Sequence, residues 1–441
     1  MLIQLLFVLV AIIIGARLGG IGLGVMGGVG LAILCFVFGL QPTAPPIDVM
    51  LMIAAVISAA SCMQAAGGLD LMVRMAERIL RSHPSHVTIL SPIVTYLFTF
   101  LAGTGHVAYS VLPVIAEVAR ESKIRPERPL GIAVIASQQA ITASPISAAT
   151  AAMLGLLAGF NVTLFDILVI TVPATLIGVI VGALCSMKVG KELDQDPEYL
   201  RRVEEGMIVL QNQHLNLENG LFKGQQKAIW SVAIFLFTTV LIVLFGSLPS
   251  LRPHFMVDGA EVVMDMPTLI EILMLMAAAV ILLVTKTDGI KATQGSVFGA
   301  GMQAVIAIFG IAWMGDTFIK GNIAELTDSI QGLVTEMPWL FCLALFVMSI
   351  LLYSQAATVR AIMPLGIALG LNPYLLVALF PAVNGYFFIP NYPTVVAAMN
   401  FDRTGTTRIG KYILNHSFMM PGLVATAVAL VIGVLLSQVL Y

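Results

Sequence analysis

Charged residues are scarce in this chain: Asp, Glu, Lys and Arg make up 10% of its 441 residues, whereas 59% are hydrophobic. With a mean hydropathy of +0.99, this composition excludes a soluble globular protein and indicates a polytopic helical membrane protein. The apolar runs do not alternate with polar residues, which argues against an outer-membrane barrel. The formal net charge is −2 and there is no basic patch, so we expect no nucleic-acid partner.

Cysteine is also rare, and its spacing suggests no special chemistry. The four cysteines, Cys35, Cys62, Cys185 and Cys342, all lie inside apolar segments without metal-ligand spacing. We therefore expect small buried thiols, no metal and no cofactor. HExxH, GxSxG and paired-aspartate motifs are absent, so an intramembrane enzyme has little support. The N-terminus lacks a basic region and a cleavage site, which predicts a retained first helix over Leu2 to Ala16.

Apolar segments long enough for membrane helices run along the whole chain. They fall at 2–17, 21–40, 47–66 and 164–187 in the first half, and at 228–247, 267–285, 296–319 and 412–440 in the second. An amphipathic surface helix is predicted over Leu69 to Arg81, and Ile323 to Thr335 occupies the same position in the second half.

Two further apolar stretches are interrupted. The segment Val87 to Ala102 stops at Gly103-Thr104-Gly105-His106, and a second short arm follows. Neither arm reaches the roughly 20 residues that cross a bilayer comfortably, so we interpret 87–119 as a re-entrant hairpin. The next segment, 130–159, breaks at Thr142-Ala143-Ser144-Pro145 and is predicted to be a discontinuous helix. The second half repeats both features, as a hairpin at 339–371 and a broken helix at 373–400.

This pattern predicts an all-α fold of two inverted repeats, 1–187 and 228–441, joined by a cytoplasmic linker at 188–227. Each repeat has five spans, one of them the broken helix, which gives about ten crossings plus two hairpins, and the odd number inverts the second copy. With both termini periplasmic, every Lys and Arg among the 22 except Arg252, Lys320 and Arg360 lies on an inward-facing segment. Two full crossings in place of each hairpin would preserve this parity, so the charges do not test re-entrance.

The interruptions are the predicted transport site. A helix broken inside the membrane presents unpaired N–H groups and the positive end of its dipole, which suit an anion. Small packing residues are the alternative for any single Ser or Thr, but four clusters at repeat-related places favour a site. The predicted substrate-binding residues are Thr104, Gly105, His106, Ser144, Pro145, Ser147, Ser354, Gln355, Thr358, Arg360, Asn391 and Thr394.

Two of these residues allow a second interpretation. His106 would donate to a carboxylate or carry a coupled proton, or it would simply bond a backbone carbonyl. Arg360 would contact substrate or a counter-ion, because its fork matches a carboxylate. Alternatively it would snorkel or pair with an acid such as Glu117 or Asp316.

Eight short stretches spread over nearly the whole chain stand out together: Gly15-Ala16-Arg17-Leu18-Gly19-Gly20-Ile21, Gly67-Gly68-Leu69-Asp70, Ala102-Gly103-Thr104-Gly105-His106, Arg125-Pro126-Glu127-Arg128-Pro129, Thr142-Ala143-Ser144-Pro145-Ile146-Ser147-Ala148-Ala149, Tyr353-Ser354-Gln355-Ala356-Ala357, Asn391-Tyr392-Pro393-Thr394 and Thr404-Gly405-Thr406-Thr407-Arg408-Ile409-Gly410. In these stretches and in their order the chain resembles the Dcu family of anaerobic C4-dicarboxylate transporters, specifically the DcuA/DcuB branch. Val395 follows Thr394 where the DcuB type has Asp, so the chain looks nearer the DcuA type.

The resemblance implies an inner-membrane protein of Gram-negative bacteria that exchanges fumarate, malate or aspartate for succinate. Kinship with the wider ion-transporter superfamily implies a lipid-embedded homodimer with an elevator-like mechanism, in which a fixed scaffold includes 21–40 and 228–247. Sodium-coupled relatives carry Ser-Asn-Thr at the hairpin tips, whereas this chain has Gly103-Thr104-Gly105 and Ser354-Gln355-Ala356. Antiport or proton coupling is therefore expected. A sodium- or proton-coupled carboxylate symporter and a dicarboxylate-binding membrane co-sensor remain the alternatives.

Overall fold

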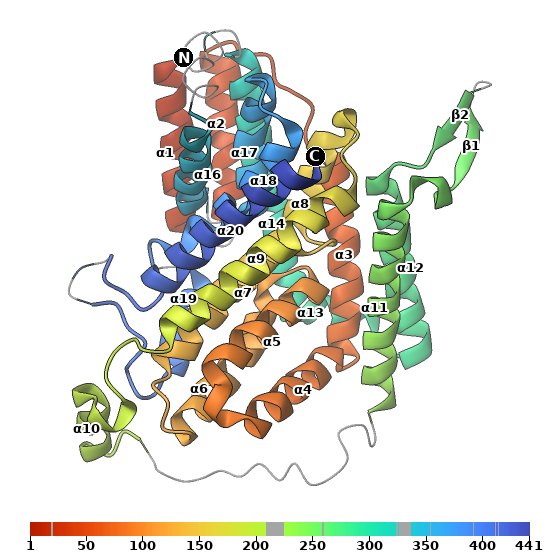
Figure 1. The fold of residues 1–441 in the computed structure, drawn as a ribbon. Coiled ribbons are helices and arrows are strands. Elements are labelled where there is room, and N and C mark those ends of the chain that lie inside the picture. Colours follow the sequence, from red (N-terminus) through yellow and green to blue (C-terminus); the bar gives the residue numbers. More distant parts are fainter. Residues whose placement is uncertain are drawn as a thin grey trace.

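The structure, a computed structural model, is almost wholly helical (Figure 1). It describes residues 1–18, 21–208, 225–257, 260–322, 325, 337–352, 354–390, 392–410, 412 and 414–441. Within these residues, 7 helices are long and apolar enough to cross a membrane, or 8 if one bent pair counts as a span. The prediction of a polytopic helical membrane protein is confirmed, and the count of ten crossings stays a prediction.

The first half consists of helices joined by short turns. They are α1 (Leu2–Leu18), α2 (Gly22–Ala32, continued by the π-helical turn η1, Ile33–Val37), α3 (Ile47–Ala65), α4 (Gly68–Ser82), η2 (Pro84–His86), α5 (Val87–Ala102), η3 (Gly105–Val107), α6 (Ala108–Glu121), α7 (Glu127–Ala143), α8 (Ala148–Leu157), η4 (Ala158–Phe160), α9 (Leu164–Ser186), η5 (Leu193–Gln195) and α10 (Pro197–Glu204).

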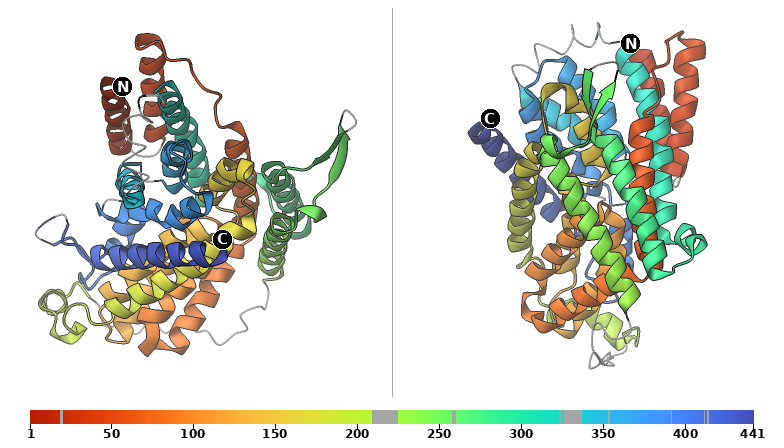
Figure 2. Two further views of the ribbon diagram at one scale, coloured as in Figure 1. Left: turned by 45° about the horizontal axis from the view of Figure 1, so that its top comes forward. Right: turned by 90° about the vertical axis from the view of Figure 1, so that its right-hand side faces the viewer.

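The second half begins after the linker. Its elements are α11 (Gln226–Ser247), η6 (Pro249–Leu251), β1 (His254–Val257), β2 (Ala260–Val263), α12 (Met266–Thr285), α13 (Gly289–Gln294), α14 (Ser296–Gly321), α16 (Pro338–Leu352), α17 (Gln355–Ala368), α18 (Pro373–Leu379), the 3-10 segment η7 (Phe380–Phe387), α19 (Pro393–Phe401) and α20 (Met419–Leu440). The strands pair antiparallel, with Val257 opposite Ala260, and project from one side of the molecule (Figure 2).

The same order of elements occurs in both halves. Two helices around a tip (α5 and α6) precede an interrupted helix (α7 and α8) and a long helix (α9). The second half repeats this order with α16 and α17, then α18, η7 and α19, then α20. The inverted repeat and the re-entrant hairpins stay predictions.

Helix α7 lies at the centre of the molecule. Every residue from Arg128 to Ala143 except Ile141 is buried, and the helix packs against α5, α9, α6 and α20. A helix covered on all sides needs no amphipathic stripe. The polar residues that α7 carries, such as Gln138 and Gln139, are therefore held away from water and lipid.

A second hydrophobic cluster joins α1, α2, α14 and α17 beside the main core. The crossing of α2 and α14 is very close, because a Cβ on Gly310 would stand 1.7 Å from the carbonyl oxygen of Gly24. Helices α11 and α12 lie on the opposite side and pack mainly against each other, α3 and α4 (Figure 1).

The structure corrects one boundary of the sequence analysis. The last helix was expected over 412–440, but it begins at Met419. The polar residues before it are bound elsewhere: the Ser417 hydroxyl donates to Glu127, and His416 contacts the carbonyl of Phe388. The amphipathic helix expected at 69–81 is present as α4. Its predicted counterpart at 323–335 falls almost entirely outside the described residues.

Candidate functional site

Two serine hydroxyls form hydrogen bonds with backbone groups at the interruption between α7 and α8. Ser144 leaves helical geometry, with ψ 128°, and its hydroxyl donates to the carbonyl of Phe100 at 2.7 Å. The Ser147 hydroxyl donates to the carbonyl of Ile141 at 2.6 Å and accepts from the N–H of Thr150 at 3.1 Å. Pro145, between the two serines, is buried. These predicted site residues hold the break in place.

The first tip, Gly103 to Val107, packs directly on this break. Gly103 adopts a left-handed φ of +69°, and a Cβ there would stand 2.9 Å from Ile146, so only glycine fits. Thr104 faces a cavity of about 80 Å³ whose other walls come mostly from α3 and α14. A Cβ on Gly105 would lie 3.2 Å from Ile141 of α7. The side chain of His106 lies outside what the structure describes.

The second tip reaches α7 from the other half of the chain. Ser354 caps α17 by accepting from the N–H of Ala357, and its carbonyl accepts from the Thr358 hydroxyl at 2.8 Å. Gln355 then bridges three elements, because its Nε2 lies 3.1 Å from the carbonyl oxygen of Gln138, 2.9 Å from Oδ1 of Asn384 and 2.6 Å from Oη of Tyr386.

Asn384 continues this network into the first half. It lies in η7, where its own φ and ψ depart from helical values, and it is fully buried. Its Nδ2 donates to Oε1 of Gln139 at 3.1 Å and to the hydroxyl of Thr142 at 3.3 Å. Gln139 in turn donates to the hydroxyl of Thr426 on α20 at 3.0 Å. We call Gln139, Thr142, Gln355, Asn384 and Tyr386 the core amide network.

Most members of this network were missed by the sequence analysis, which identified Gln355 alone. A signal was present, because Ser137-Gln138-Gln139 and Asn384 are polar residues inside otherwise apolar segments. Such residues in membrane helices usually face other protein or a cavity rather than lipid.

The remaining predicted residues lie around the second interruption and on α17. Thr394, in the first turn of α19, is 2% exposed. The ring of Tyr392 lies 4.3 Å from that of Tyr386 in the network. Asn391 lies outside the described residues. Arg360 is close enough to Asp316 of α14 for their charges to interact, and the role of this arginine stays a prediction.

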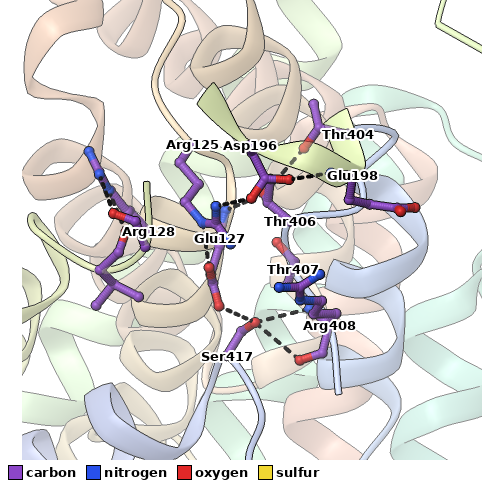
Figure 3. A network of polar contacts seen from close by, with 12 residues as sticks. Arg125, Glu127, Arg128, Asp196, Glu198, Thr404, Thr406, Thr407, Arg408 and Ser417 are labelled. Atoms are coloured by element: carbon purple, nitrogen blue, oxygen red, sulfur yellow. Dashed lines mark hydrogen bonds and ion pairs between the residues drawn. The ribbon is translucent and has the colours of Figure 1, made fainter. Parts of the chain in front are cut away.

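A second polar region, built from charges, lies at the end of the molecule that carries α10 (Figure 1), and its contacts are drawn in Figure 3. Arg125 donates to Glu127 at 2.5 Å and to Asp196 just before α10. Both side chains of the Arg125–Asp196 pair are 5% exposed. Burial by itself would raise the pKa of Asp196, but the hydrogen bond and the charge of Arg125, together with the backbone N–H groups of Tyr199 and Glu198, outweigh it, so the pKa lies below its usual value.

The loop that precedes α20 joins this charged region. Ser417 donates to Glu127 at 2.6 Å, and the Thr406 hydroxyl accepts from the N–H of Glu127 at 3.2 Å (Figure 3). The carboxylate of Asp402 accepts from the N–H of Thr404 at 2.9 Å and from the Thr406 hydroxyl at 2.8 Å. These contacts tie the loop to the start of α7.

A pocket of about 640 Å³ opens beside these contacts. Arg125, Arg128 and Arg408 line it together with His416. Arg128 donates to the carbonyl of Val189 at 2.8 Å and pairs with Glu192 at 3.0 Å. We call the residues of this pocket, with Asp196 and Asp402, the charged end.

Comparison with known proteins gives a consistent result over the whole chain. The family described as "Anaerobic c4-dicarboxylate membrane transporter" matches residues 1–441. "Anaerobic C4-dicarboxylate transporter DcuB" of Escherichia coli O157:H7 is 41% identical over 98% of this chain and 97% of its own length. "C4-dicarboxylate transporter DcuA" is 42% identical, over 99% of both chains, in Wolinella succinogenes and in Escherichia coli strain K12. These identities do not separate the two types, so the DcuA assignment stays a prediction.

One solved structure also aligns with most of the chain. It is that of Neisseria gonorrhoeae MtrF, which is described as illuminating a class of antimetabolite efflux pumps. Its TM-score is 0.48 at 13% identity, over 93% of this chain and 84% of that one.

Proposed function

The chain belongs to the family of anaerobic C4-dicarboxylate membrane transporters, and from this premise we propose that it exchanges C4-dicarboxylates across the bacterial inner membrane. The principal exchange is of external fumarate, malate or aspartate for internal succinate under anaerobic conditions. Both termini are proposed to be periplasmic, with the charged end in the cytoplasm.

The proposed substrate site lies along α7, between the two tips and the two interruptions. The observation that carries this assignment is the amide of Gln355, whose contacts join α17, η7 and α7 at one point. The first tip meets the same helix through Gly105 at Ile141. Ser144, Ser147 and Thr394 complete the neutral groups around this region.

A site of this kind suits a transported dianion. Amide N–H groups and helix ends attract carboxylates without a fixed positive charge. A transporter must release its substrate as well as bind it, and a dianion held by dipoles leaves more readily than one held by buried arginines. The neutral character of the core amide network therefore supports exchange in both directions.

We further propose an elevator-like movement within a homodimer. In this scheme α5 to α9 and α16 to α20 form the moving part, and a scaffold that includes α2 and α11 stays fixed. The peripheral position of α11 and α12, which pack mainly against α3 and α4, supports their place outside the moving part.

Counterflow in proteoliposomes tests the proposed function. Vesicles loaded with fumarate should take up labelled succinate, and vesicles loaded with acetate should not. Failure of exchange by protein that elutes as a single folded species would refute the proposal. Uptake into unloaded vesicles that requires sodium or a proton gradient would indicate the symporter alternative. Succinate binding without any flux would indicate the co-sensor alternative.

A further inference from the structure

Two adjacent glutamines on α7 differ in their side-chain hydrogen bonds: one is fully bonded and the other has none among the described residues. Gln139 is fully buried and bonded at both ends of its side chain, to Asn384 and to Thr426. Gln138 is 1% exposed, and neither its Nε2 nor its Oε1 has a hydrogen-bond partner among the described residues. The contrast concerns two residues of the same type, on the same helix, at the same depth in the protein.

An unpartnered amide is costly in this environment. Buried polar side chains are nearly always hydrogen-bonded, and leaving one unpaired costs its full desolvation penalty. A membrane interior offers no bulk water to relieve that cost. Methionine or leucine would fill a similar volume on α7 without the penalty, so the amide at position 138 lowers stability unless something else bonds to it.

Gln138 lies at the point where the two tips approach α7. Its own backbone carbonyl accepts the amide of Gln355 from the second tip at 3.1 Å. The first tip lies beside it, because a Cβ on Gly105 would stand 3.2 Å from Ile141 and 3.9 Å from the carbonyl oxygen of Ser137. A ligand held between the tips would therefore lie next to this side chain.

The surroundings favour an anion as the missing partner. Gln139, Thr142, Gln355, Asn384 and Tyr386 are neutral, so no fixed carboxylate in the core amide network would repel it. A primary amide supplies two N–H donors, and hydrogen bonds to a charged carboxylate are stronger than those between neutral groups. A cationic ligand would find no carboxylate in this network to neutralise it.

We propose that the side-chain amide of Gln138 is a substrate-contacting group that donates to one carboxylate of the transported dicarboxylate. This inference rests on the proposed function and adds a residue to the site. Without substrate the amide of Gln138 has no hydrogen-bond partner among the described residues, and a bound carboxylate would provide one. The desolvation penalty of the unpaired amide exists only when the site is empty. Its removal therefore contributes to the free energy of substrate binding.

The test replaces each glutamine with methionine, which keeps the length of the side chain but cannot donate. Gln138→Met should leave the thermal midpoint of the empty full-length protein in detergent unchanged or raise it. It should also weaken succinate binding by about tenfold to a hundredfold, as expected for one lost bond to a charged group. The matched control, Gln139→Met, should lower the thermal midpoint, because it removes two partnered bonds.

The readouts are thermal unfolding with and without succinate, succinate affinity by calorimetry, and the KM of counterflow. Gln138→Met protein that binds succinate with wild-type affinity would overturn the proposal, even if exchange by the wild type is intact. So would a loss of thermal stability in Gln138→Met equal to that in Gln139→Met, because the amide would then have a structural partner. Absence of exchange by the wild type would instead refute the proposed function.

Discussion

The core amide network and the charged end both connect distant parts of the chain, but they use different chemical groups. Both join the two halves of the chain through polar contacts between residues far apart in sequence. In the core, Gln355, Asn384 and Gln139 do this with neutral amides. At the charged end, Ser417 and Thr406 from the second half bind Glu127, and Arg125 pairs with Glu127 and with Asp196 of the linker (Figure 3).

The difference follows from the cost of burying charge. A charged side chain deep in a bilayer is expensive, whereas one near its edge reaches water or headgroups. A buried amide that loses its partner is costly, but a buried ion pair that loses one partner is costlier still. The charged end therefore suits a stable junction, and the amide network suits a place where contacts change during transport.

The largest effect on stability is expected from Arg125→Met at the charged end. This change leaves the carboxylates of Glu127 and Asp196 without their cation. Removing one partner of a buried pair costs about 3 kcal/mol or more, so the thermal midpoint in detergent should fall clearly. In the double variant Arg125→Met/Asp196→Leu, at least half of that loss should be recovered. A double variant less stable than the single one would contradict this account of the junction.

The next effect is expected from Asn384→Leu in the core. The variant loses three interhelical hydrogen bonds, to Gln355, Gln139 and Thr142. At about 0.6 kcal/mol for each such bond in a membrane protein, the loss is about 2 kcal/mol. Thermal unfolding and counterflow should both be impaired.

Asn322→Leu is a suitable control for this variant. Asn322, directly after α14, is also buried, but its side chain donates to the backbone carbonyl of Phe318 within α14 and so joins no second helix. It should therefore change stability less and leave exchange intact. If Asn384→Leu exchanged succinate at the wild-type rate, the core amide network would be structural only.

The prediction from sequence succeeded where the cause is local. The helix Val87–Ala102 has the predicted bounds, because Gly103 ends it with a backbone conformation that other residues avoid. The break at Ser144 follows from the Ser-Pro pair beside it. The strands β1 and β2 also had a local signal that was overlooked: Asp258-Gly259 is typical of two-residue hairpin turns.

The prediction failed where the partners are distant. Gln139 and Asn384 lie 245 positions apart, and Gln355 lies 217 positions from Gln138. No local pattern states that these amides meet, because their pairing depends on how the two halves pack. The late start of α20 has the same origin, since Ser417 and His416 are bound by Glu127 and Phe388 rather than by their own helix.

A smaller effect, on pH dependence, is expected from His416 at the charged end. Burial lowers the pKa of this histidine below its ordinary value of 6.5, and the hydrogen bond to the carbonyl of Phe388 only partly opposes this. Its Nδ1 accepts from the N–H of Phe418 at 3.2 Å while Nε2 contacts that carbonyl at 3.1 Å. The folded protein therefore holds the neutral ring.

The sign of the pH effect follows from this arrangement. The contribution of His416 is complete above 6.5 and is lost as the pH falls through the lowered pKa of the folded state. A protonated ring would also share its pocket with Arg125, Arg128 and Arg408. The thermal midpoint should therefore decrease when the pH is lowered from about 8 to about 5.5. The decrease should be smaller in His416→Gln. Identical pH profiles for the two proteins would contradict the assignment.

The smallest effect is expected from Arg202→Ala, at the outer edge of the charged end. Arg202 pairs with Glu198 on the same helix at 2.7 Å and donates to the carbonyl of Arg403 at 3.0 Å. Its side chain is 30% exposed, against 5% for Arg125. Removing one partner of an exposed ion pair lowers the free energy of unfolding much less than removing one partner of a buried pair. The shift in thermal midpoint should therefore be at most about a third of that for Arg125→Met. Because the Debye length falls to about 3 Å at 1 M salt and exposed charges are screened more than buried ones, the Arg202 effect should shrink in 1 M NaCl while the Arg125 effect persists. If both effects vanished together, the junction at Arg125 would be as solvated as the surface, and the contrast between a buried ionic joint and its exposed edge would be lost.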